Sequence, residues 1–484
     1  MLIASQILGL IAPQWILLVA AMLVLALDLT LGEEREGWLP YIALLGLGAA
    51  LVASLSLWNR QVALFEGLFL IDRFAVFFQI IAVLATGLVI LASIGYFEGK
   101  TPYKGQFYAL LLVTALAITL LASAADLVMV FISIEVLSVT SYTLTGYLIA
   151  DRKSTEAGLK FFLYGAAASA IMLYGMTLLY GATGSTNLAE IGRTLSLASG
   201  EGSRWLPIAA IVMLLVGFGF KVSAAPFHQW APDVYEGAPT PFAAFLSVGS
   251  KAAGFAILLR VFLTALPDFR VDWFALVTTL SIATMTLGNL IAIFQENIKR
   301  MLAYSSIAQA GYILIGLACW DPQATGRESI SAILFYLLAY LFTNLGAFTV
   351  VIAVERAVGT NEISDYAGLI RRNPWLAAAL FVFFLSLVGI PPTGVFVGKL
   401  LIFAAAVRLE YYALVIVALI NGVISLYYYY GVLRRVFFLA PRDEAPIAVS
   451  TPLRVVLAVT LIMTLGTAIF AQPFIRLALT SAVL

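Results

Sequence analysis

The chain has very little of what soluble enzymes and redox proteins are built from. Only 11% of its 484 residues are charged, whereas soluble domains carry roughly 25%. Its single cysteine, Cys319, excludes an internal disulfide and any cysteine-ligated iron–sulfur cluster. The sequence has no zinc-ligand spacing and no phosphate-binding loop. We therefore expect no soluble globular fold, no bound metal and no cofactor held by this chain.

An excess of one charge is missing as well. The formal net charge is +1 and no long run of Lys or Arg occurs, so composition offers no reason to expect nucleic acid as a partner. The glycine pairs Gly46/Gly48 and Gly217/Gly219 do not complete the dinucleotide fingerprint GxGxxG. They lie in apolar runs, where small residues let helices approach closely, and are interpreted as packing glycines.

Long apolar runs are what the sequence does contain. Hydrophobic residues make up 62% of it, and the mean hydropathy is +1.03. A helix needs about 20 apolar residues to cross about 30 Å of hydrocarbon, so the length allows about 14 crossings. The runs are continuous rather than alternating, which favours helices over a β-barrel. An all-α integral membrane protein with about 14 transmembrane helices is predicted, over residues 13–31, 40–58, 75–97, 107–124, 127–149, 158–181, 206–230, 240–265, 273–294, 301–320, 329–357, 375–402, 409–437 and 452–476.

The distribution of basic residues in the connections predicts an orientation. One side of the predicted bundle carries the loops around residues 151–153, 299–300, 371–372 and 434–435. It collects about 14 of the 27 Lys and Arg residues, against about 9 on the other side. By the positive-inside rule this basic side faces the cytoplasm, and both chain termini lie on the opposite side.

Four lysines fall inside the predicted spans, namely Lys160, Lys221, Lys251 and Lys399. A lysine at a helix centre costs roughly 2.5–3.5 kcal/mol even on a lenient insertion scale, so something must offset this cost. The candidate is Glu135 in LVMVFISIEVLSVTSY, an acid near the middle of its span. A carboxylate facing an ammonium allows both to persist without water, so an ion pair with Glu135 is predicted.

Intramembrane ionisable residues usually mark an ion or proton pathway. Lysine suits proton transfer because burial can lower its pKa from about 10.4 by several units, and an approaching carboxylate raises it again. Proton occupancy then depends on the charge of a neighbour. The alternative interpretation is structural, and it is strongest for Lys160, which lies near a basic loop and can pair with Glu156 one turn earlier.

Prolines interrupt two of the apolar runs. Pro226, in GFGFKVSAAPFHQWAPDVYEG, has no N–H, so the carbonyl of Val222 loses its helical partner and the helix is predicted to break beside Lys221. Pro391 and Pro392, in SLVGIPPTGVFVGKLLIF, break a span five crossings later, before the last of the four lysines. Broken helices in corresponding positions are typical of inverted repeats that hold a transport site.

Three further residues are weaker candidates. His228, the only histidine, titrates in a useful range, but it lies at the end of its span beside Trp230, where an interfacial role is the preferred interpretation. The basic start of NIKRMLAYSSIAQAGY is interpreted as a positive-inside anchor. Tyr304 and Ser305, which follow it, are candidates to line a channel.

Three stretches together carry a resemblance to a known family. FKVSAAPFHQWAPDVYEGAPTPFAAFLSVGSK, NIKRMLAYSSIAQAGY and SLVGIPPTGVFVGKL, in this order, resemble the antiporter-like membrane subunits of respiratory complex I. The subunit N branch, with its cyanobacterial and chloroplast counterparts, is the most similar, because other branches carry histidine or glutamate at a central or final lysine. The resemblance implies two inverted five-helix repeats, each with a Pro-broken helix, at residues 101–265 and 266–437. A three-helix segment (1–100) would precede them and a transmembrane helix (438–484) would follow.

The resemblance also implies roles for individual residues. Carried over by motif, Glu135 and Lys221 would form the pair of the first half-channel. Lys251 would be the central relay, and Lys399 the residue by which the proton leaves through the second half. Lys160 also falls where the family has a membrane lysine. The expected function is proton translocation through a buried Glu/Lys relay, coupled to quinone reduction elsewhere in an NADH- or ferredoxin-quinone oxidoreductase.

The same resemblance predicts which cofactors are bound by other subunits and which partners this chain has. NADH, FMN, iron–sulfur clusters and quinone are expected on other subunits, which makes this a non-redox subunit of a proton-translocating enzyme. Its expected partners are other membrane subunits, including sister antiporter-like subunits, in the lipid bilayer of a bacterial cytoplasmic membrane or alternatively a cyanobacterial thylakoid. Two alternatives stay open: the large subunit of a multisubunit cation/proton antiporter, and a membrane subunit of a hydrogenase-type complex.

Overall fold

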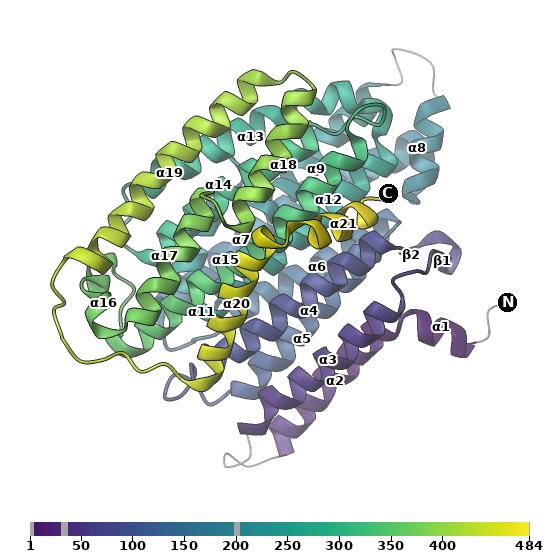
Figure 1. The fold of residues 1–484 in the computed structure, drawn as a ribbon. Coiled ribbons are helices and arrows are strands. Elements are labelled where there is room, and N and C mark those ends of the chain that lie inside the picture. Colours follow the sequence, from purple (N-terminus) through teal and green to yellow (C-terminus); the bar gives the residue numbers. More distant parts are fainter. Residues whose placement is uncertain (1–3, 31–36, 198–203, 484) are drawn as a thin grey trace.

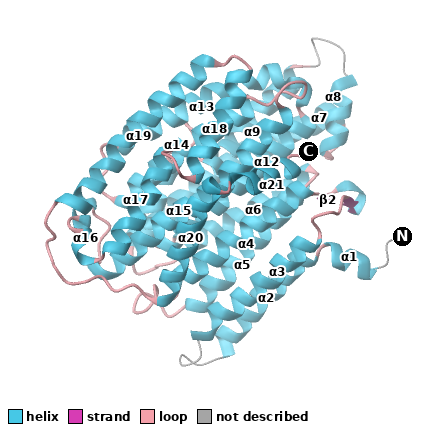
Figure 2. Cartoon of the chain, in the orientation of Figure 1, coloured by secondary structure: helices cyan, strands magenta, loops and turns pink. Residues whose placement is uncertain are grey.

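The computed structural model describes residues 4–30, 37–197 and 204–483, and these residues are almost entirely helical (Figure 2). Thirteen of the described helices are long and apolar enough to cross a membrane. The remaining predicted crossing is divided into α17 (Pro374–Val388) and α18 (Gly394–Arg408). At 1.5 Å per residue each piece is about 22 Å long, too short for the bilayer core, so the two make one crossing together. The prediction of an all-α membrane protein with about 14 crossings is confirmed.

The N-terminal part forms a helical layer at one edge of the bundle, drawn in purple in Figure 1. A short antiparallel hairpin separates its third and fourth helices, with Ala63 opposite Leu70. The elements are α1 (Ala4–Leu10), α2 (Ala12–Thr30), α3 (Leu39–Ser56), β1 (Val62–Leu64), the 3₁₀ turn η2 (Phe65–Gly67), β2 (Phe69–Ile71) and α4 (Arg73–Ser93).

The next part contains the first predicted break. The elements are α5 (Lys104–Ser123), α6 (Leu127–Thr145), α7 (Arg152–Thr183), α8 (Leu188–Leu197), α9 (Trp205–Val222), α10 (Trp230–Gly237), α11 (Thr240–Phe245), the π-helical turn η4 (Leu246–Ser250) and α12 (Lys251–Ala265). Helix α9 ends at Val222, as the missing N–H of Pro226 predicts. The last three elements of this part form one continuous crossing with a π-helical turn in its middle.

The final part contains the second break. The elements besides α17 and α18 are η5 (Pro267–Phe269), α13 (Arg270–Ala292), α14 (Ile298–Ala318), α15 (Gly326–Val358), η6 (Ile363–Tyr366), α16 (Leu369–Arg372), α19 (Tyr412–Phe438), α20 (Thr451–Ile469) and α21 (Ala471–Ser481). Helix α17 ends at Val388, three residues before the first proline of the pair. The division of the chain into repeats 101–265 and 266–437 stays a prediction.

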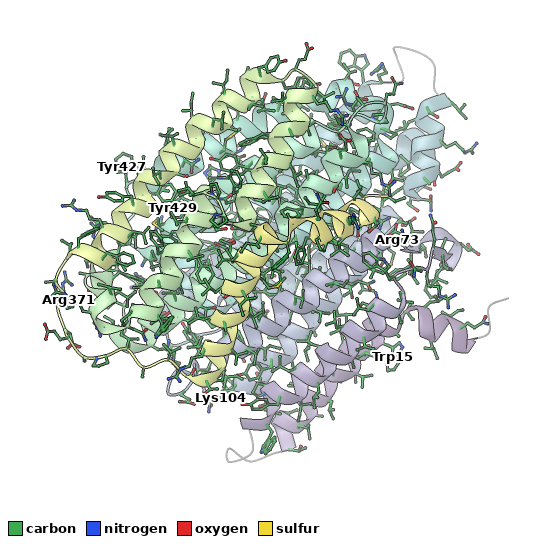
Figure 3. The ribbon with its side chains drawn as sticks, in the orientation of Figure 1. Trp15, Arg73, Lys104, Arg371, Tyr427 and Tyr429 are labelled. Carbon is green, nitrogen blue, oxygen red and sulfur yellow. The ribbon has the colours of Figure 1, made fainter. Side chains whose placement is uncertain are left out.

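Both ends of the described chain lie at the same end of the bundle. Figure 1 shows α1, α8, the hairpin and α21 at one end, and α16 at the other. Figure 3 places Arg371 of α16 at one end of the bundle, and Arg73 near the hairpin at the other. This arrangement agrees with the even number of crossings. Residues 299–300, 371–372 and 434–435, which were predicted in loops and lie near the ends of α14, α16 and α19, come together on one face, called the basic face below.

Burial differs sharply between the helices. The most apolar windows of α15 and of the crossing Thr240–Ala265 are completely buried, whereas those of α2, α3 and α7 are only one-third buried. The outer helices therefore expose apolar side chains such as Leu45 and Val52 to lipid or to neighbouring subunits. A lysine on the inner helices is surrounded by protein on every side, which makes the lysines of this core costly unless they find partners.

A buried arginine joins the N-terminal layer to the core. Arg260 of α12 donates to Asp72 through two nitrogens, at 2.6 and 3.0 Å, and to the Ala122 carbonyl at 2.9 Å. Asp72 also caps α4 by accepting from the Ala75 amide at 2.7 Å. The four lysines are therefore not the only basic residues inside the predicted spans, because Arg260 lies within 240–265 and was not selected from the sequence. Its bidentate geometry offsets the desolvation of both charges.

We expect Asp72→Asn to lower the stability of the protein by about 3 kcal/mol, because removing one partner of a buried ion pair leaves the other charge uncompensated. The thermal midpoint of the purified protein and the amount of folded protein in membranes measure this effect. Glu66→Gln in the exposed η2 turn is the matched control and is expected to be neutral. Equal stability of the two variants would contradict the assignment of Arg260–Asp72 as a structural pair.

Candidate functional site

Three of the predicted lysines are deeply buried, and none forms an ion pair. Lys221, Lys251 and Lys399 are 5%, 1% and 6% exposed. Within the part of the chain that the structure describes, no carboxylate oxygen lies within 4.0 Å of any of the three ammonium nitrogens. Each is held instead by neutral oxygen atoms. These lysines are therefore surrounded by acceptors that can serve a charged or a neutral amine at similar geometry.

Lys221 lies at the end of the first broken helix. It is the penultimate residue of α9, and the chain turns at Ser223, which adopts a left-handed conformation with φ 61°. The freed backbone groups find partners, since the Trp230 indole donates to the Phe220 carbonyl at 3.1 Å and the Ala225 amide donates to Thr284 at 2.9 Å. The peptide bond before Pro226 is cis, and Pro226 itself is exposed at the outer side of the break.

The predicted pair of Glu135 and Lys221 is not a direct ion pair, and that prediction was wrong in its geometry. Lys221 Nζ donates to the Ser138 hydroxyl at 2.6 Å. The Glu135 carboxylate, three residues earlier on the same face of α6, accepts from Ser169 of α7 at 2.6 Å. The sequence predicted one direct contact between the two side chains. In the structure each contacts a serine hydroxyl instead, Lys221 that of Ser138 and Glu135 that of Ser169. The reason is register, because Glu135 lies toward α7 and is half-buried, while Ser138 faces α9 and is fully buried.

Lys251 follows the π-helical turn η4 and donates to the Ser306 carbonyl of α14. π-Helical turns inside α-helices occur frequently at functional sites because they shift the side chains that follow. Close packing brings the helix that begins with this lysine, α12, against the end of α9 that carries Lys221. A Cβ at Gly254, one turn after Lys251, would meet Val222 at 2.9 Å and the Lys221 Cβ at 3.2 Å. Glycine at this position allows α12 to approach the broken end of α9.

Lys399 lies at the second break, on the helix that follows it, α18. Its Nζ donates to the carbonyls of Leu387 at 3.2 Å and Val388 at 2.7 Å, which are freed by the end of α17. The negative end of the α17 dipole also favours a cation here. Gly389, with φ 91°, passes so close to the Lys399 side chain that a Cβ would lie 2.8 Å from its Cδ. The cis peptide bond between Pro391 and Pro392 follows, with both prolines exposed.

Helix α14 carries a polar stripe between the second and third lysines. The Ser305 hydroxyl contacts the Tyr429 hydroxyl, and Gln309 donates to the Leu387 carbonyl at 2.9 Å, the same oxygen that Lys399 uses. Tyr336 donates to the Gln309 amide oxygen. Of these residues the sequence interpretation selected only Ser305. The available signal was the spacing of polar residues 305, 309 and 312 in an apolar helix, which places them on one face.

The remaining candidates lie nearer the basic face. Lys160, 40% exposed, pairs with Asp233 at 2.7 Å and with Glu156 at 2.8 Å. Arg300 of α14 joins the same group through Asp233 at 2.6 Å. Burial works to raise the pKa of the Asp233 carboxyl, but hydrogen bonds from Lys160 and Arg300 hold it below its usual value. Lys160 therefore belongs to a partly hydrated ion network and not to the buried set.

His228 and Tyr304 are both half-buried. His228 lies in the break between α9 and α10, and its Nδ1 atom has no partner among the described residues. Tyr304 lies one turn after Arg300 on α14 and is not part of the polar stripe that Ser305 begins. Neither residue contacts one of the three buried lysines through a described hydrogen bond. A role for either in a proton pathway stays a prediction.

A further buried cluster was missed at the sequence level. Lys299, interpreted as a basic anchor, is only 3% exposed and donates to the Ala238 carbonyl at 2.7 Å. Nearby, Glu355 of α15 accepts from Tyr96 at 2.8 Å and from Lys100 at 3.2 Å. These groups line a cavity of about 610 Å³ at the basic face. The cluster was not predicted from the sequence because its charged residues lie near helix ends, where such residues are normally solvated.

The fold and the site together define a class of protein: a many-helix membrane protein whose buried lysines lie at and between two broken helices, as in ion-translocating subunits. The family described as NADH:quinone oxidoreductase/Mrp antiporter transmembrane subunits matches residues 124–425. This is more than half of the sequence, and the chain belongs to that family.

Individual relatives are similar over almost the full length. NAD(P)H-quinone oxidoreductase subunit 2 of Rippkaea orientalis is 43% identical, over 98% of this chain and 94% of the relative. NADH-quinone oxidoreductase subunit N of Trichlorobacter lovleyi is 43% identical, over 90% and 89% respectively. A chain of respiratory complex I from Thermus thermophilus superposes with a TM-score of 0.81 at 33% identity, covering 96% of this chain and 98% of that one. A chain of the Mrp complex from a Dietzia species, with a TM-score of 0.85 at 22% identity and coverage of 98% and 97%, shares the fold.

We expect Ser138→Ala to lower proton translocation by roughly tenfold, because it removes the one hydroxyl that holds the Lys221 ammonium on the Glu135 side. Ser133→Ala on the same helix is the matched control, since the Ser133 hydroxyl is buried but has no partner among the described residues. Proton uptake by membrane vesicles, with the amount of assembled protein measured alongside, checks this expectation. Equal loss in both variants would show that Ser138 acts only through packing.

Proposed function

We propose that this chain translocates protons as the subunit N-type, antiporter-like membrane subunit of an NADH- or ferredoxin-quinone oxidoreductase. Both curated relatives are named as subunits of such an enzyme and align with 90% or more of the chain. The observation that carries the proposal is the row of three buried lysines, at the two helix breaks and between them, each held by neutral acceptors. Charge without a counter-ion at membrane depth is costly and is rarely kept without a function.

The first half of the proposed pathway works through the side chain of Glu135. When Glu135 turns from Ser169 toward Ser138, its negative charge approaches Lys221 and favours the ammonium form of that lysine. When it turns back, Lys221 can release its proton across the close α9–α12 contact toward Lys251. The Ser138 hydroxyl accepts from Lys221 and donates to the Ile134 carbonyl. It would turn its O–H toward Glu135 when the carboxylate approaches, and would then bridge acid and base.

The second half runs along α14. A proton released by Lys251 reaches the polar stripe of Ser305, Gln309 and Tyr429, which ends at the carbonyl shared by Gln309 and Lys399. Hydroxyl groups and intervening waters move the proton, while Gln309 fixes the position of its neighbours. Lys399 receives the proton at the break between α17 and α18, where the carbonyls of Leu387 and Val388 stabilise its charged form.

Redox chemistry is proposed to take place elsewhere in the complex. NADH, FMN, iron–sulfur clusters and quinone would be bound by other subunits, a proposal supported by the single cysteine of the chain and the absence of nucleotide motifs in its sequence. Its partners would be further membrane subunits, including sister antiporter-like subunits, which cover part of the exposed apolar surface. The bacterial cytoplasmic membrane is the proposed location, with a thylakoid membrane as the alternative.

The test measures proton pumping and electron transfer together in membrane vesicles that carry Lys221→Ala or Lys251→Met, with assembly checked on native gels. We expect both activities to fall at least about tenfold while the complex assembles, because each variant removes a proton-transfer group. Lys153→Met, at a lysine that is 70% exposed, is the control and keeps pumping.

Two results would overturn the proposal. Unchanged pumping and turnover in an assembled Lys221→Ala complex would make this lysine structural. Pumping that follows an imposed sodium gradient and ignores NADH and quinone would instead favour the large subunit of a multisubunit cation/proton antiporter, which shares the family and the fold.

A further inference from the structure

A second hollow opens at the basic face, away from the three lysines. It has a volume of about 790 Å³ and lies between the end of α13, the segment 362–364 and the last turns of α19. Its lining includes the carboxylates of Glu296 and Glu362 and the guanidinium groups of Arg434 and Arg435. Charged groups of both signs at the mouth favour water over lipid in this hollow.

The hollow ends at a buried cluster that reaches Lys399. Tyr428, which lines the hollow, donates its hydroxyl to the Asn289 amide oxygen at 3.1 Å. The Asn289 amide nitrogen donates to the Tyr312 hydroxyl at 3.2 Å. The Tyr312 ring lies beneath the Lys399 ammonium, with 4.3 Å between Nζ and the ring centroid. Three helices, α13, α14 and α19, thus contribute hydrogen-bonded side chains that lead from the hollow to the tyrosine ring beneath the lysine.

A second asparagine strengthens this cluster. Asn289 also donates to the Asn421 amide oxygen at 3.2 Å, and Asn421 donates to Thr286 at 3.2 Å. Amide groups inside apolar spans are expensive unless they are fully hydrogen-bonded. A purely structural role, clamping α13 to α19, would account for the two asparagines. It does not account for the hollow that leads from the basic face to Tyr428.

Side-chain direction on α19 agrees with a polar inner face. In Figure 3, Tyr427 points away from the bundle and Tyr429 points into it. Tyr427 is 67% exposed and Tyr429 only 1%. The run of four tyrosines at positions 427–430 therefore divides between the outer surface and the buried polar cluster. Tyr428 is the member that joins the hollow to this cluster.

We propose that Lys399 exchanges protons with the basic face through this hollow and the Tyr428–Asn289–Tyr312 cluster, so that the second half of the chain has an inlet of its own. The inference rests on the proposed proton-translocating function. Water that enters beside the cluster carries a proton from the hollow past the Tyr428 and Tyr312 hydroxyls to the neutral amine of Lys399. The water in the hollow that gives up this proton regains one from bulk water. Asn289 and Asn421 are positioning residues, because an amide holds hydroxyls in place but exchanges protons poorly. Lys399 was expected from the resemblance to be an exit, and the inlet gives it a second route.

Cysteine accessibility tests the inlet directly, because the one native cysteine, Cys319, is buried. Gly431→Cys at the hollow and Asn289→Cys behind it are treated with a membrane-impermeant charged thiol reagent, in vesicles of either orientation. We expect both to react from the cytoplasmic, basic face and not from the other. Val423→Cys, on the apolar side of α19 and 72% exposed, is the control and reacts from neither face. An Asn289→Cys thiol that stays unreactive from the basic face overturns the inlet.

Tyr428→Phe supplies an independent readout, because it removes the hydroxyl and keeps the ring. We expect roughly tenfold slower proton pumping in a fully assembled complex, with no further loss when it is added to Lys399→Met. Tyr412→Phe, at an exposed position of the same helix, keeps normal pumping. Lower assembly or thermal stability without a pumping defect would assign the cluster a clamping role and refute the inlet. If Lys221→Ala stops pumping while Tyr428→Phe does not slow it, the inlet alone fails and the proposed function stands.

Discussion

The structure depends on the way two helices end inside the membrane. A helix that stops at membrane depth leaves carbonyl groups without donors, and a lysine at the same depth is an ammonium without acceptors. At the second break the lysine and the helix end satisfy each other, because the Lys399 ammonium donates to the last carbonyls of α17. At the first break an indole and a threonine hydroxyl satisfy the backbone, and Lys221 is left to the Ser138 hydroxyl. The fold can therefore hold three amines in its core without opposing charges.

Partly exposed charges near the basic face and the buried lysines are held in different ways. Near that face, Lys160, Asp233 and Arg300 form a network in which each charge has at least one opposite partner. Deeper in the bundle, Lys251 donates to one neutral acceptor among the described residues, the Ser306 carbonyl. An ionic network fixes its charges, whereas a neutral acceptor leaves the charge of the amine open to change by a neighbour.

Much of the fold followed from the sequence, because it depended on local chemistry. The missing N–H of Pro226 placed the end of α9 at Val222, and apolar runs fixed the crossings. What failed were contacts between helices, which depend on the rotation of each helix about its axis. Glu135 lies toward α7 and not toward Lys221, and Arg260 finds Asp72, 188 residues away. The asparagine and glutamine residues of the core were not predicted, because the interpretation of the sequence relied on charged residues and amides carry no charge.

The central claim is that a buried lysine must lose and regain its proton, and Lys251→Arg tests it most directly. Arginine keeps the positive charge and the hydrogen-bonding capacity but does not deprotonate in proteins. The number of protons pumped per NADH oxidised should be measured in vesicles containing assembled Lys251→Arg complex. Pumping should be lost as fully as in a complex without any amine at this position. Normal pumping by the arginine variant would contradict it, because a fixed charge would then be sufficient.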